Sequence, residues 1–287
     1  MAKKPTAKTP SAKTPSAKTP SAKTPSAKTP NRRKPAKKTD ETIGQARLVV
    51  RRAMIKDIRG IAALIRRVYT ELPPYKQSEI RGQINNFPDG CFVALLDDEV
   101  VGYCASMQLP EPVAFAPHDW DEITGNGYGS RHDPTGDWLY GYEMCVDPKV
   151  RGVRIGRRLY EERRALAEEN DLTGIVFGGR MPGYDRARRR KTDKVESPED
   201  YLDRLVAGKL HDPVLRFQLA NGFEPQGVMR KYLPEDKASR GNAVMMVWRN
   251  PYVERDQPVK KRLPRGVESV RVATCQLQAR AVADYEE

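Results

Sequence analysis

The pattern of apolar and polar positions predicts an α/β fold over residues 46–252. Apolar residues three and four positions apart indicate a helix over 56–69 and a weaker one over 77–88. Residues 91–109 are mostly apolar on both sides of a polar turn at Asp97–Glu99, which predicts a hairpin of two apolar strands. This part of the chain is therefore expected to place two helices beside a sheet.

The remaining elements continue the alternation of strands and helices. They are a strand over 46–54 before the first helix, a strand over 138–148, a helix over 152–169, a strand over 174–180, a short helix over 198–207, a helix over 212–223 and two closing strands over 224–233 and 242–250. Two polar stretches interrupt them: 111–137 is expected to be irregular, and 181–197 is a basic insertion. The order predicts one mixed α/β domain on a single sheet, over 46–252.

The N-terminal segment 1–45 differs in composition from this domain. Its repeated unit AKTPS places proline at every fifth position and contains no bulky apolar residue, so it is predicted to be a disordered tail. Of the net charge of +13, residues 1–39 carry +12, which leaves the rest of the chain nearly neutral. Two interpretations stay open: weak, salt-dependent contact of 1–39 with nucleic acid or another polyanion, or a solubilising leader.

The C-terminal residues follow a different pattern again. Residues 253–266 are charged and contain proline, and are predicted to be a linker. Residues 267–287 begin with a strand-like run. One strand cannot bury a face on its own, so this run is expected to be the start of a second domain that the chain does not complete.

Cysteine and histidine usage bounds the classes of function. The four cysteines (Cys91, Cys104, Cys145 and Cys275) have apolar neighbours and no paired spacing, which indicates reduced thiols and a cytoplasmic location. The three histidines are scattered, so no metal site is expected. No apolar run approaches the roughly 20 residues that cross a bilayer, so no membrane contact is expected.

A cluster of arginine and glycine lies where the strand over 138–148 meets the helix over 152–169. It comprises Arg151, Gly152, Val153, Arg154, Ile155, Gly156, Arg157 and Arg158. The first turn of a helix has unpaired N–H groups and a positive dipole end, and glycine lets a phosphate approach the backbone. Arginine side chains add charge and can bind phosphate oxygens in a fork. These features predict a diphosphate site; the alternative is a solvated basic helix start.

This cluster, together with the order of elements and the sequence Asn-Gly-Phe at 221–223, resembles the GNAT acyltransferase superfamily. The family pattern is [Q/R]-x-x-G-x-[G/A], which cradles the pyrophosphate of acetyl-CoA. Arg151 matches its first position and Gly156 its last, whereas Arg154 replaces the middle glycine. The resemblance covers about 46–252. It implies a mainly antiparallel sheet flanked by helices, acetyl-CoA as co-substrate bound by residues 151–157, and an amine acceptor.

The resemblance also implies roles for the strand before the cluster. Glu143 matches a position that supplies the general base in many family members; an ordinary carboxylate paired with an arginine is the alternative. Backbone N–H groups of Met144, Cys145 or Val146 are expected to bind the thioester oxygen, near a bulge that separates two strands. The Cys145 side chain is expected to be a core residue rather than a nucleophile.

The proton donor to the departing thiolate is left open by the sequence. The family places a tyrosine five residues before the phenylalanine of Asn-Gly-Phe, and here that residue is Gln218. The possible substitutes are Tyr140, Tyr142, Tyr184 and Tyr232. Tyr69 and Tyr75 are candidates for the wall of the acceptor pocket. The stretches 125–133 and 180–191 are expected to be loops.

A closer resemblance concerns the stretches GRMPGY, DPVLRFQLANGF, YLPEDKAS and MMVWRNP. They are similar to the acetyltransferase-like N-terminal half of bacterial fusion proteins whose second half is a carbon–nitrogen hydrolase of the nitrilase superfamily. The run VRVATCQLQ is similar to the first strand of that hydrolase, so Cys275 is not its nucleophile. Three functions follow: an N-acyltransferase, a non-catalytic coenzyme A-binding domain that regulates a fused hydrolase, or polyanion binding through the tail.

Overall fold

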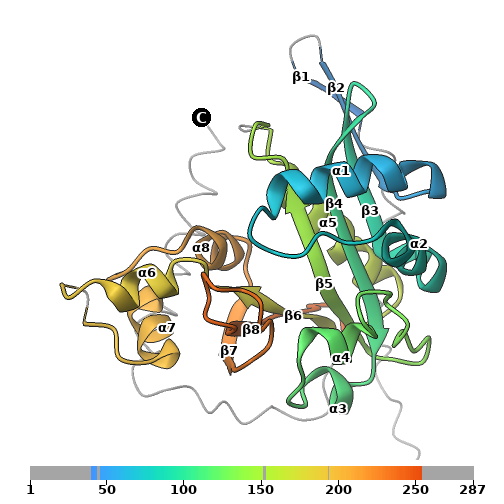
Figure 1. Ribbon diagram of the computed structural model, residues 1–287. Coiled ribbons are helices and arrows are strands. Elements are labelled where there is room, and N and C mark those ends of the chain that lie inside the picture. Colours follow the sequence, from blue (N-terminus) through green and yellow to red (C-terminus); the bar gives the residue numbers. More distant parts are fainter. Residues whose placement is uncertain (1–39, 44–45, 151–152, 193, 254–287) are drawn as a thin grey trace, which may run out of the picture. The chain divides into compact units, whose positions relative to one another are not determined.

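The computed structural model describes residues 40–43, 46–150, 153–192 and 194–253 (Figure 1). Residues 1–39 and 44–45 of the tail predicted over 1–45, residues 254–266 of the predicted linker and the predicted strand within 267–287 lie outside the described residues. Arg151 and Gly152 of the predicted anion site also lie outside them, as does Cys275.

The described residues form one mixed sheet with the strand order β1-β2-β3-β4-β5-β6-β8-β7. The strands are β1 (Asp40–Ile43), β2 (Ala46–Arg52), β3 (Cys91–Leu96), β4 (Glu99–Leu109), β5 (Trp138–Val146), β6 (Gly174–Arg180), β7 (Glu224–Met229) and β8 (Ala243–Arg249). Neighbours are antiparallel except β5 and β6, which run parallel. The predicted mainly antiparallel α/β sheet is confirmed; β1 lies before the boundary predicted at residue 46.

Helices cover both faces of this sheet (Figure 1). They are α1 (Ile58–Val68), α2 (Gln77–Asn86), α3 (Glu111–Ala114), α4 (Trp120–Thr124), α5 (Ile155–Glu169), α6 (Tyr184–Arg189), α7 (Pro198–Val206) and α8 (Pro213–Ala220), with short 3₁₀ turns at Ile55–Asp57 and Pro88–Gly90. Each long predicted helix is present within a few residues of its expected bounds.

The period of two along the strands divides the core into two layers. Cys91 and Val93 of β3 pack in the layer that holds α1 and α2, whereas Phe92 and Ala94 pack in the layer that holds α5. Both faces of β3 are therefore buried, which explains why its sequence is apolar without interruption.

The two insertions contain more regular structure than expected. Residues 111–137 hold α3 and α4, and residues 181–197 hold α6. These helices have four to six residues, too few for an apolar period to show in the sequence. Asp119 marks the start of α4, because its carboxylate accepts a hydrogen bond from the N–H of Glu122 at 2.7 Å.

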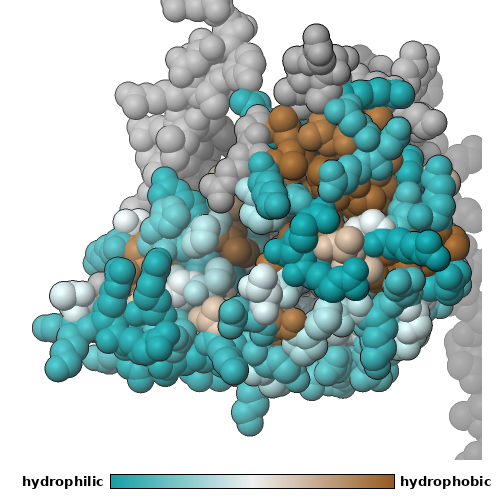
Figure 2. Space-filling model, turned by 45° about the horizontal axis from the view of Figure 1, so that its top comes forward, coloured by the Kyte–Doolittle hydropathy of each residue, from teal (hydrophilic) through white to brown (hydrophobic). Residues whose placement is uncertain are grey.

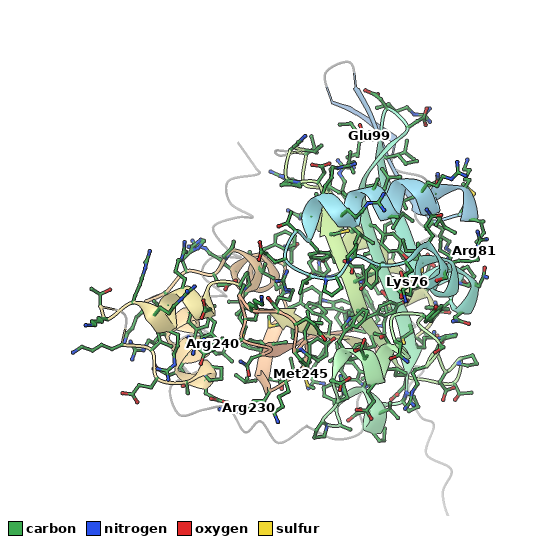
Figure 3. The ribbon with its side chains drawn as sticks, viewed as in Figure 1. Lys76, Arg81, Glu99, Arg230, Arg240 and Met245 are labelled. Carbon is green, nitrogen blue, oxygen red and sulfur yellow. The ribbon has the colours of Figure 1, made fainter. Side chains whose placement is uncertain are left out.

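Charged side chains lie on the outside of the domain. Arg81, Glu99, Arg230 and Arg240 project outward from different parts of the ribbon (Figure 3). The face in Figure 2 is mostly hydrophilic, with one apolar area bordered by hydrophilic side chains. Within the described ranges, no helix combines the length and the apolar character that a membrane crossing requires.

Candidate active site

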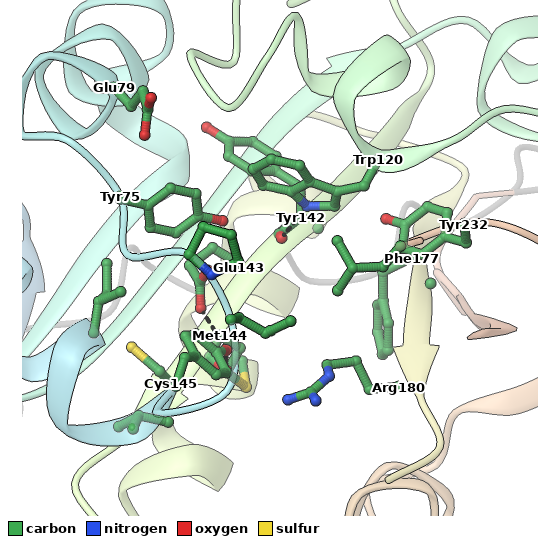
Figure 4. Close-up of a pocket in the computed structure, with 18 of the residues that line it drawn as sticks. Tyr75, Glu79, Trp120, Tyr142, Glu143, Met144, Cys145, Phe177, Arg180 and Tyr232 are labelled. Carbon is green, nitrogen blue, oxygen red and sulfur yellow. Dashed lines mark hydrogen bonds between the residues drawn. The ribbon is translucent and has the colours of Figure 1, made fainter. Parts of the chain in front are cut away.

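The two parallel strands at the centre of the sheet separate along their length. β5 and β6 pair only over Trp138–Tyr140 and Gly174–Val176, although β5 continues to Val146 and β6 to Arg180. The opening between them contains a cavity of about 580 Å³ (Figure 4). It is lined on one side by Gly141–Val146 and on the other by Phe177, Gly178 and Arg180. The separation of the strands thus creates a slot through the sheet.

A bulge in β5 lies beside this slot. Ala105 pairs with Glu143 and Ser106 with Gly141, so Tyr142 is the extra residue. Arg163 of α5 lies directly under the bulge, and its guanidinium donates to Ser106 Oγ at 2.8 Å, to Ala105 O at 2.7 Å and to Glu143 O at 2.5 Å. The bulge therefore rests on a buried cation that fixes the two strands.

Arg163 is a residue that sequence analysis missed. It lies on the buried face of α5 with Leu159 and Leu166, and its side chain is only 2% exposed. An arginine at a core position of an amphipathic helix was the available signal, since such a charge is buried only when carbonyls or carboxylates receive it. A Cβ at Gly141 would lie 3.0 Å from Arg163 Nη1, so glycine makes room for the guanidinium.

The register shows which amides of β5 face the slot. The N–H of Asp147 donates to Val101 O of β4 at 2.8 Å. Because the direction of N–H groups alternates along a strand, the amide of Cys145 also points toward β4, and those of Met144 and Val146 point toward β6. Of the three backbone positions predicted to bind an oxygen, two are aimed at the opening.

Glu143 lies on the wall of the slot and is 6% exposed. Its Oε1 accepts a hydrogen bond from Tyr69 Oη at 2.8 Å, and Tyr69 also donates to Met144 O at 3.1 Å (Figure 4). Burial raises the pKa of the Glu143 carboxyl, against the opposing effect of the Tyr69 and Tyr75 hydroxyls. A carboxylate with a raised pKa is a better proton acceptor than an exposed one.

The alternative for Glu143 was an ion pair with a nearby arginine. The arginine beside it, Arg180, instead pairs with Asp236. Arg180 also lines the slot, but its guanidinium binds Asp236 in a fork with distances of 2.7 and 2.8 Å. Asp236 is buried, and it also accepts a hydrogen bond from Ser239 Oγ at 2.6 Å. The Glu143 carboxylate is thus held by hydroxyl groups, while Arg180 has its own acidic partner.

The described part of the predicted phosphate cluster caps α5. Arg154 has a φ of 54° and is the residue before the first turn. This is the left-handed conformation that glycine adopts at least cost, which is consistent with a glycine at this position in the family pattern. Val153 is partly buried, and the side chain of Ile155 is buried, so only the backbone of Ile155 can face a ligand.

Gly156 and Arg157, two further members of the cluster, differ in their surroundings. A Cβ at Gly156 would lie 2.8 Å from Phe217 Cζ, so glycine lets α8 pack against the start of α5. Arg157 is exposed and pairs with Glu161 at 3.0 Å, one turn along the helix. The α5 start therefore offers backbone N–H groups and two exposed arginine side chains to an anion.

The predicted tyrosines have different positions relative to the slot. Tyr142 and Tyr232 line it, whereas Tyr140 lies behind Tyr232 and Tyr184 packs against Tyr201 elsewhere. Sequence analysis missed Tyr160, a buried residue of α5 that also lines the slot.

Gln218 lies where the family pattern places its tyrosine, and it also lines the slot. The side chain is buried, and its Oε1 is a buried oxygen without a hydrogen-bond partner in the described part of the chain. A buried carbonyl oxygen without a donor is costly, so a bound ligand with a donor group would satisfy it.

The Cys145 thiol is buried, and burial, together with the charge of Glu143, raises its pKa well above the ordinary value. A thiolate is therefore disfavoured there, as expected for a core residue.

Aromatic side chains form the wall above Glu143. Tyr75 and Trp120 have ring centroids 5.6 Å apart, and Trp120 Nε1 donates to Tyr142 O at 3.1 Å (Figure 4). Tyr69 and Tyr75 both line the cavity, as predicted. The glycine-rich loop at 125–133 contributes Asn126 to the lining, and its Gly127 O accepts from Gln83 Nε2 at 2.7 Å.

Two comparisons show what kind of domain holds this slot. Residues 58–189 match the acetyltransferase (GNAT) family. The chain therefore contains a GNAT acetyltransferase domain over these residues. The uncharacterised N-acetyltransferase YkwB of Bacillus subtilis (strain 168) is 28% identical over 228 residues, which is 72% of this chain and 98% of YkwB. The GNAT match thus spans α1 to α6 and includes the residues of β5 and β6 that line the slot.

A second relative is longer than this chain. The probable hydrolase YhcX of the same organism is 33% identical over 252 residues, which cover 88% of this chain and 48% of YhcX. The chain therefore spans about half the length of YhcX. Among solved structures, the GNAT-like decarboxylase GphF in complex with isobutyryl-CoA has a TM-score of 0.59 at 26% identity, covering 70% of this chain and 98% of GphF.

Within the residues that the structure describes, no group of three or more histidine, cysteine, aspartate or glutamate side chains is arranged to hold a metal ion.

Proposed function

We propose that the domain is a coenzyme A-dependent N-acetyltransferase that moves the acetyl group of acetyl-CoA directly to an amine. The observation that carries the proposal is the position of Glu143: a buried carboxylate with a raised pKa, on the wall of a slot that opens beside the start of α5. The resemblance to the N-acetyltransferase YkwB supports this choice, and the resemblance to GphF in complex with isobutyryl-CoA supports binding of an acyl-CoA.

The surroundings of the slot suit the parts of acetyl-CoA. The diphosphate would lie against the N–H groups of the α5 start and the side chains of Arg154 and Arg157, with Arg151 and Gly152 as further predicted ligands. The acyl end would lie between β5 and β6, where the amides of Met144 and Val146 face the opening and can donate to the thioester oxygen.

Glu143 would accept the proton that the amine loses. The amine nitrogen forms a bond to the acyl carbon, the carbon–sulfur bond breaks, and the sulfur leaves with the bonding electrons. An alkylamine has a pKa near 10.4, so about one molecule in a few thousand is neutral at pH 7. A base with a raised pKa in a buried site assists that step.

The acceptor side of the cavity favours a positively charged amine. Three carboxylates from different elements line it: Glu79 of α2, Asp121 of α4 and Glu235 of the loop between β7 and β8. Burial, followed by the charges of Glu235 and Asp119, raises the pKa of Asp121. Together with the aromatic wall, they would attract an ammonium group and stabilise its alkyl stem.

A second candidate is a coenzyme A-binding domain without acyltransferase activity that regulates a fused hydrolase. Two observations favour it: Gln218 replaces the family's tyrosine, and the chain covers only about half of YhcX. Contact of residues 1–39 with a polyanion and a cytoplasmic location also remain proposals. The location is supported by the free thiols of Cys91, Cys104 and Cys145.

The variant Glu143→Gln separates the two candidates. The transferase proposal expects turnover of acetyl-CoA with amine acceptors to fall by about 10² to 10⁴ while the affinity for acetyl-CoA, measured by isothermal titration, stays the same. Arg157→Ala is the matched control, because it should weaken coenzyme affinity and leave the rate at saturation unchanged. Binding of acetyl-CoA without turnover by the wild type across an amine panel would favour the regulatory domain.

A further inference from the structure

A chain of three side chains connects a partly buried histidine to the slot. His118 Nε2 lies 2.7 Å from Tyr140 Oη, and Tyr140 Oη lies 3.1 Å from Tyr232 Oη. Tyr232 lines the cavity, and Tyr140 is fully buried behind it. The chain reaches the cavity on the β6 side, opposite the wall that carries Glu143.

Three contacts fix Tyr232 at the inner end of this chain. A Cβ at Gly178 would lie 2.4 Å from Tyr232 Cε1, so the ring lies directly against the β6 backbone and requires glycine there. The N–H of Gly178 also acts on the Tyr232 hydroxyl, where it opposes the rise in pKa that burial causes. The carbonyl of Tyr232 accepts from the N–H of Trp120 at 2.7 Å, which connects the loop between β7 and β8 to α4.

The protonation state of His118 sets the direction of the chain. His118 Nδ1 lies 2.7 Å from Ala116 O, and a carbonyl only accepts, so Nδ1 carries a hydrogen. When Nε2 also carries one, it donates to Tyr140, and Tyr140 donates to Tyr232. The Tyr232 oxygen then accepts from Tyr140, which leaves its own hydrogen free to point toward the cavity. When His118 is neutral, Nε2 accepts from the Tyr140 hydroxyl and Tyr140 accepts from the Tyr232 hydroxyl, so both hydrogen bonds run in the opposite direction.

We infer that Tyr232 donates the proton to the departing coenzyme A thiolate, and that His118 supplies it through Tyr140. This inference rests on the acyl transfer proposed above. Gln218 cannot fill this role, because an amide carries no ionisable proton. The hydrogen-bonded chain instead ends in a histidine, the side chain that gains and loses protons near neutral pH.

The protons balance along this route. As the carbon–sulfur bond breaks, the sulfur takes the hydrogen of Tyr232, Tyr232 takes that of Tyr140, and Tyr140 takes the Nε2 hydrogen of His118. The amine proton goes to Glu143. The cycle ends with neutral His118 and protonated Glu143, and exchange of one proton with water at each residue restores the starting state.

Tyr160 is another tyrosine that lines the slot, near Gln218. It packs against Phe177, Phe217 and Phe223, with ring centroids 6.0, 5.6 and 4.7 Å away, and its hydroxyl contacts Gln218. An amide neither supplies nor removes a proton, so Tyr160 has no source of protons behind it. Tyr232 has one.

Several groups bear on the pKa of His118. Burial lowers it, and the Ala116 carbonyl and the carboxylates of Glu122 and Asp119 oppose that effect. Tyr140 and Tyr232 face its ring. The charged form that directs Tyr232 toward the slot is lost as the pH rises through this pKa. The rate with acetyl-CoA should therefore show a falling limb there, which His118→Gln should remove.

The decisive experiment varies the leaving group. The kcat/KM of the full chain is measured with acetyl-CoA and with S-acetyl-4-nitrothiophenol, whose thiolate leaves without protonation. Tyr232→Phe should lower the value for acetyl-CoA by about 10²-fold and leave the aryl thioester within about threefold. Tyr140→Phe should lower kcat/KM for acetyl-CoA by a smaller factor and should likewise leave the value for the aryl thioester nearly unchanged. Tyr184→Phe is the control, because Tyr184 is a buried tyrosine that does not belong to the hydrogen-bonded series His118–Tyr140–Tyr232.

Each outcome separates this inference from the proposed function. The role of Tyr232 would be overturned if Tyr232→Phe lowered kcat/KM equally for acetyl-CoA and for the aryl thioester. It would also be overturned if Tyr160→Phe, rather than Tyr232→Phe, lowered kcat/KM for acetyl-CoA alone. Either result would leave acyl transfer intact. No turnover of either donor by the wild type would refute the transferase itself. Circular dichroism and acetyl-CoA titration of Tyr232→Phe confirm that a loss of rate is not a loss of folding or binding.

Discussion

The two walls of the slot are built in different ways. The β5 wall consists of consecutive residues, Gly141–Val146, on one strand. The β6 wall combines Phe177 and Gly178 with side chains from distant parts of the chain, such as Gln218 and Tyr232. A local motif can specify the first wall, but only tertiary packing specifies the second. Substitutions on the two walls should therefore differ in what they disturb.

The largest expected effect comes from the bulge on the β5 wall. Arg163→Met removes the donor to Ala105 O and Glu143 O and leaves two buried carbonyls unsatisfied. The free energy of unfolding should fall by about 2–4 kcal/mol, and the acetyl-CoA affinity should fall with it. Urea denaturation followed by circular dichroism measures the first quantity. A loss below about 0.5 kcal/mol would show that the bulge does not depend on the guanidinium.

The next effect concerns the β6 wall. Gly178→Ala places a methyl group against the Tyr232 ring, which must move because β6 backbone cannot. Turnover should fall at least tenfold, with a loss of unfolding free energy of about 1–3 kcal/mol. Gly208→Ala is a comparison at a site with open space, although its φ of 71° adds backbone strain there. If turnover were unchanged, the position of Tyr232 would not matter to the reaction.

A third prediction concerns the pH dependence of stability on the β5 wall. The folded-state pKa of Glu143 is raised by burial, so the protonated form favours folding. This contribution is fully present below the unfolded pKa and is lost as the pH rises through the folded pKa. The wild type should therefore lose unfolding free energy relative to Glu143→Gln as the pH rises from about 4 toward neutrality. Parallel curves for the two proteins across that range would contradict the raised pKa.

The smallest effect is expected at the rim of the slot. Arg157→Ala removes an exposed pair with Glu161, which should change the free energy of unfolding by less than about 0.5 kcal/mol. The affinity for acetyl-CoA should nevertheless fall severalfold, and more at low salt than at high salt. Isothermal titration at two salt concentrations tests this. A salt-independent affinity would place the diphosphate away from this arginine.

The sequence predicted the elements whose signals are local. The apolar run of β3 and β4, the turn at Asp97 and the helix after the arginine cluster all follow from short-range periods, whereas Glu143 was singled out by the resemblance of its position to the GNAT family. Arg163 and Tyr160 were missed because both lie on the apolar face of α5, where only packing reveals their contacts. Tyr232 could not be chosen over the other tyrosines, because its link to His118 joins residues more than 100 positions apart.

The short pairing of β5 with β6 has a thermodynamic consequence. Within the sheet, the backbone pairing between β1–β5 and the unit of β6, β8 and β7 involves only three residues of β5 and three of β6. Local opening at this seam should cost less free energy than unfolding either part, and amide hydrogen exchange should report two cooperative units. A ligand that lies in the slot touches both units at once. Its binding energy would couple them, so the molecule should become most cooperative in its unfolding when its substrate is bound.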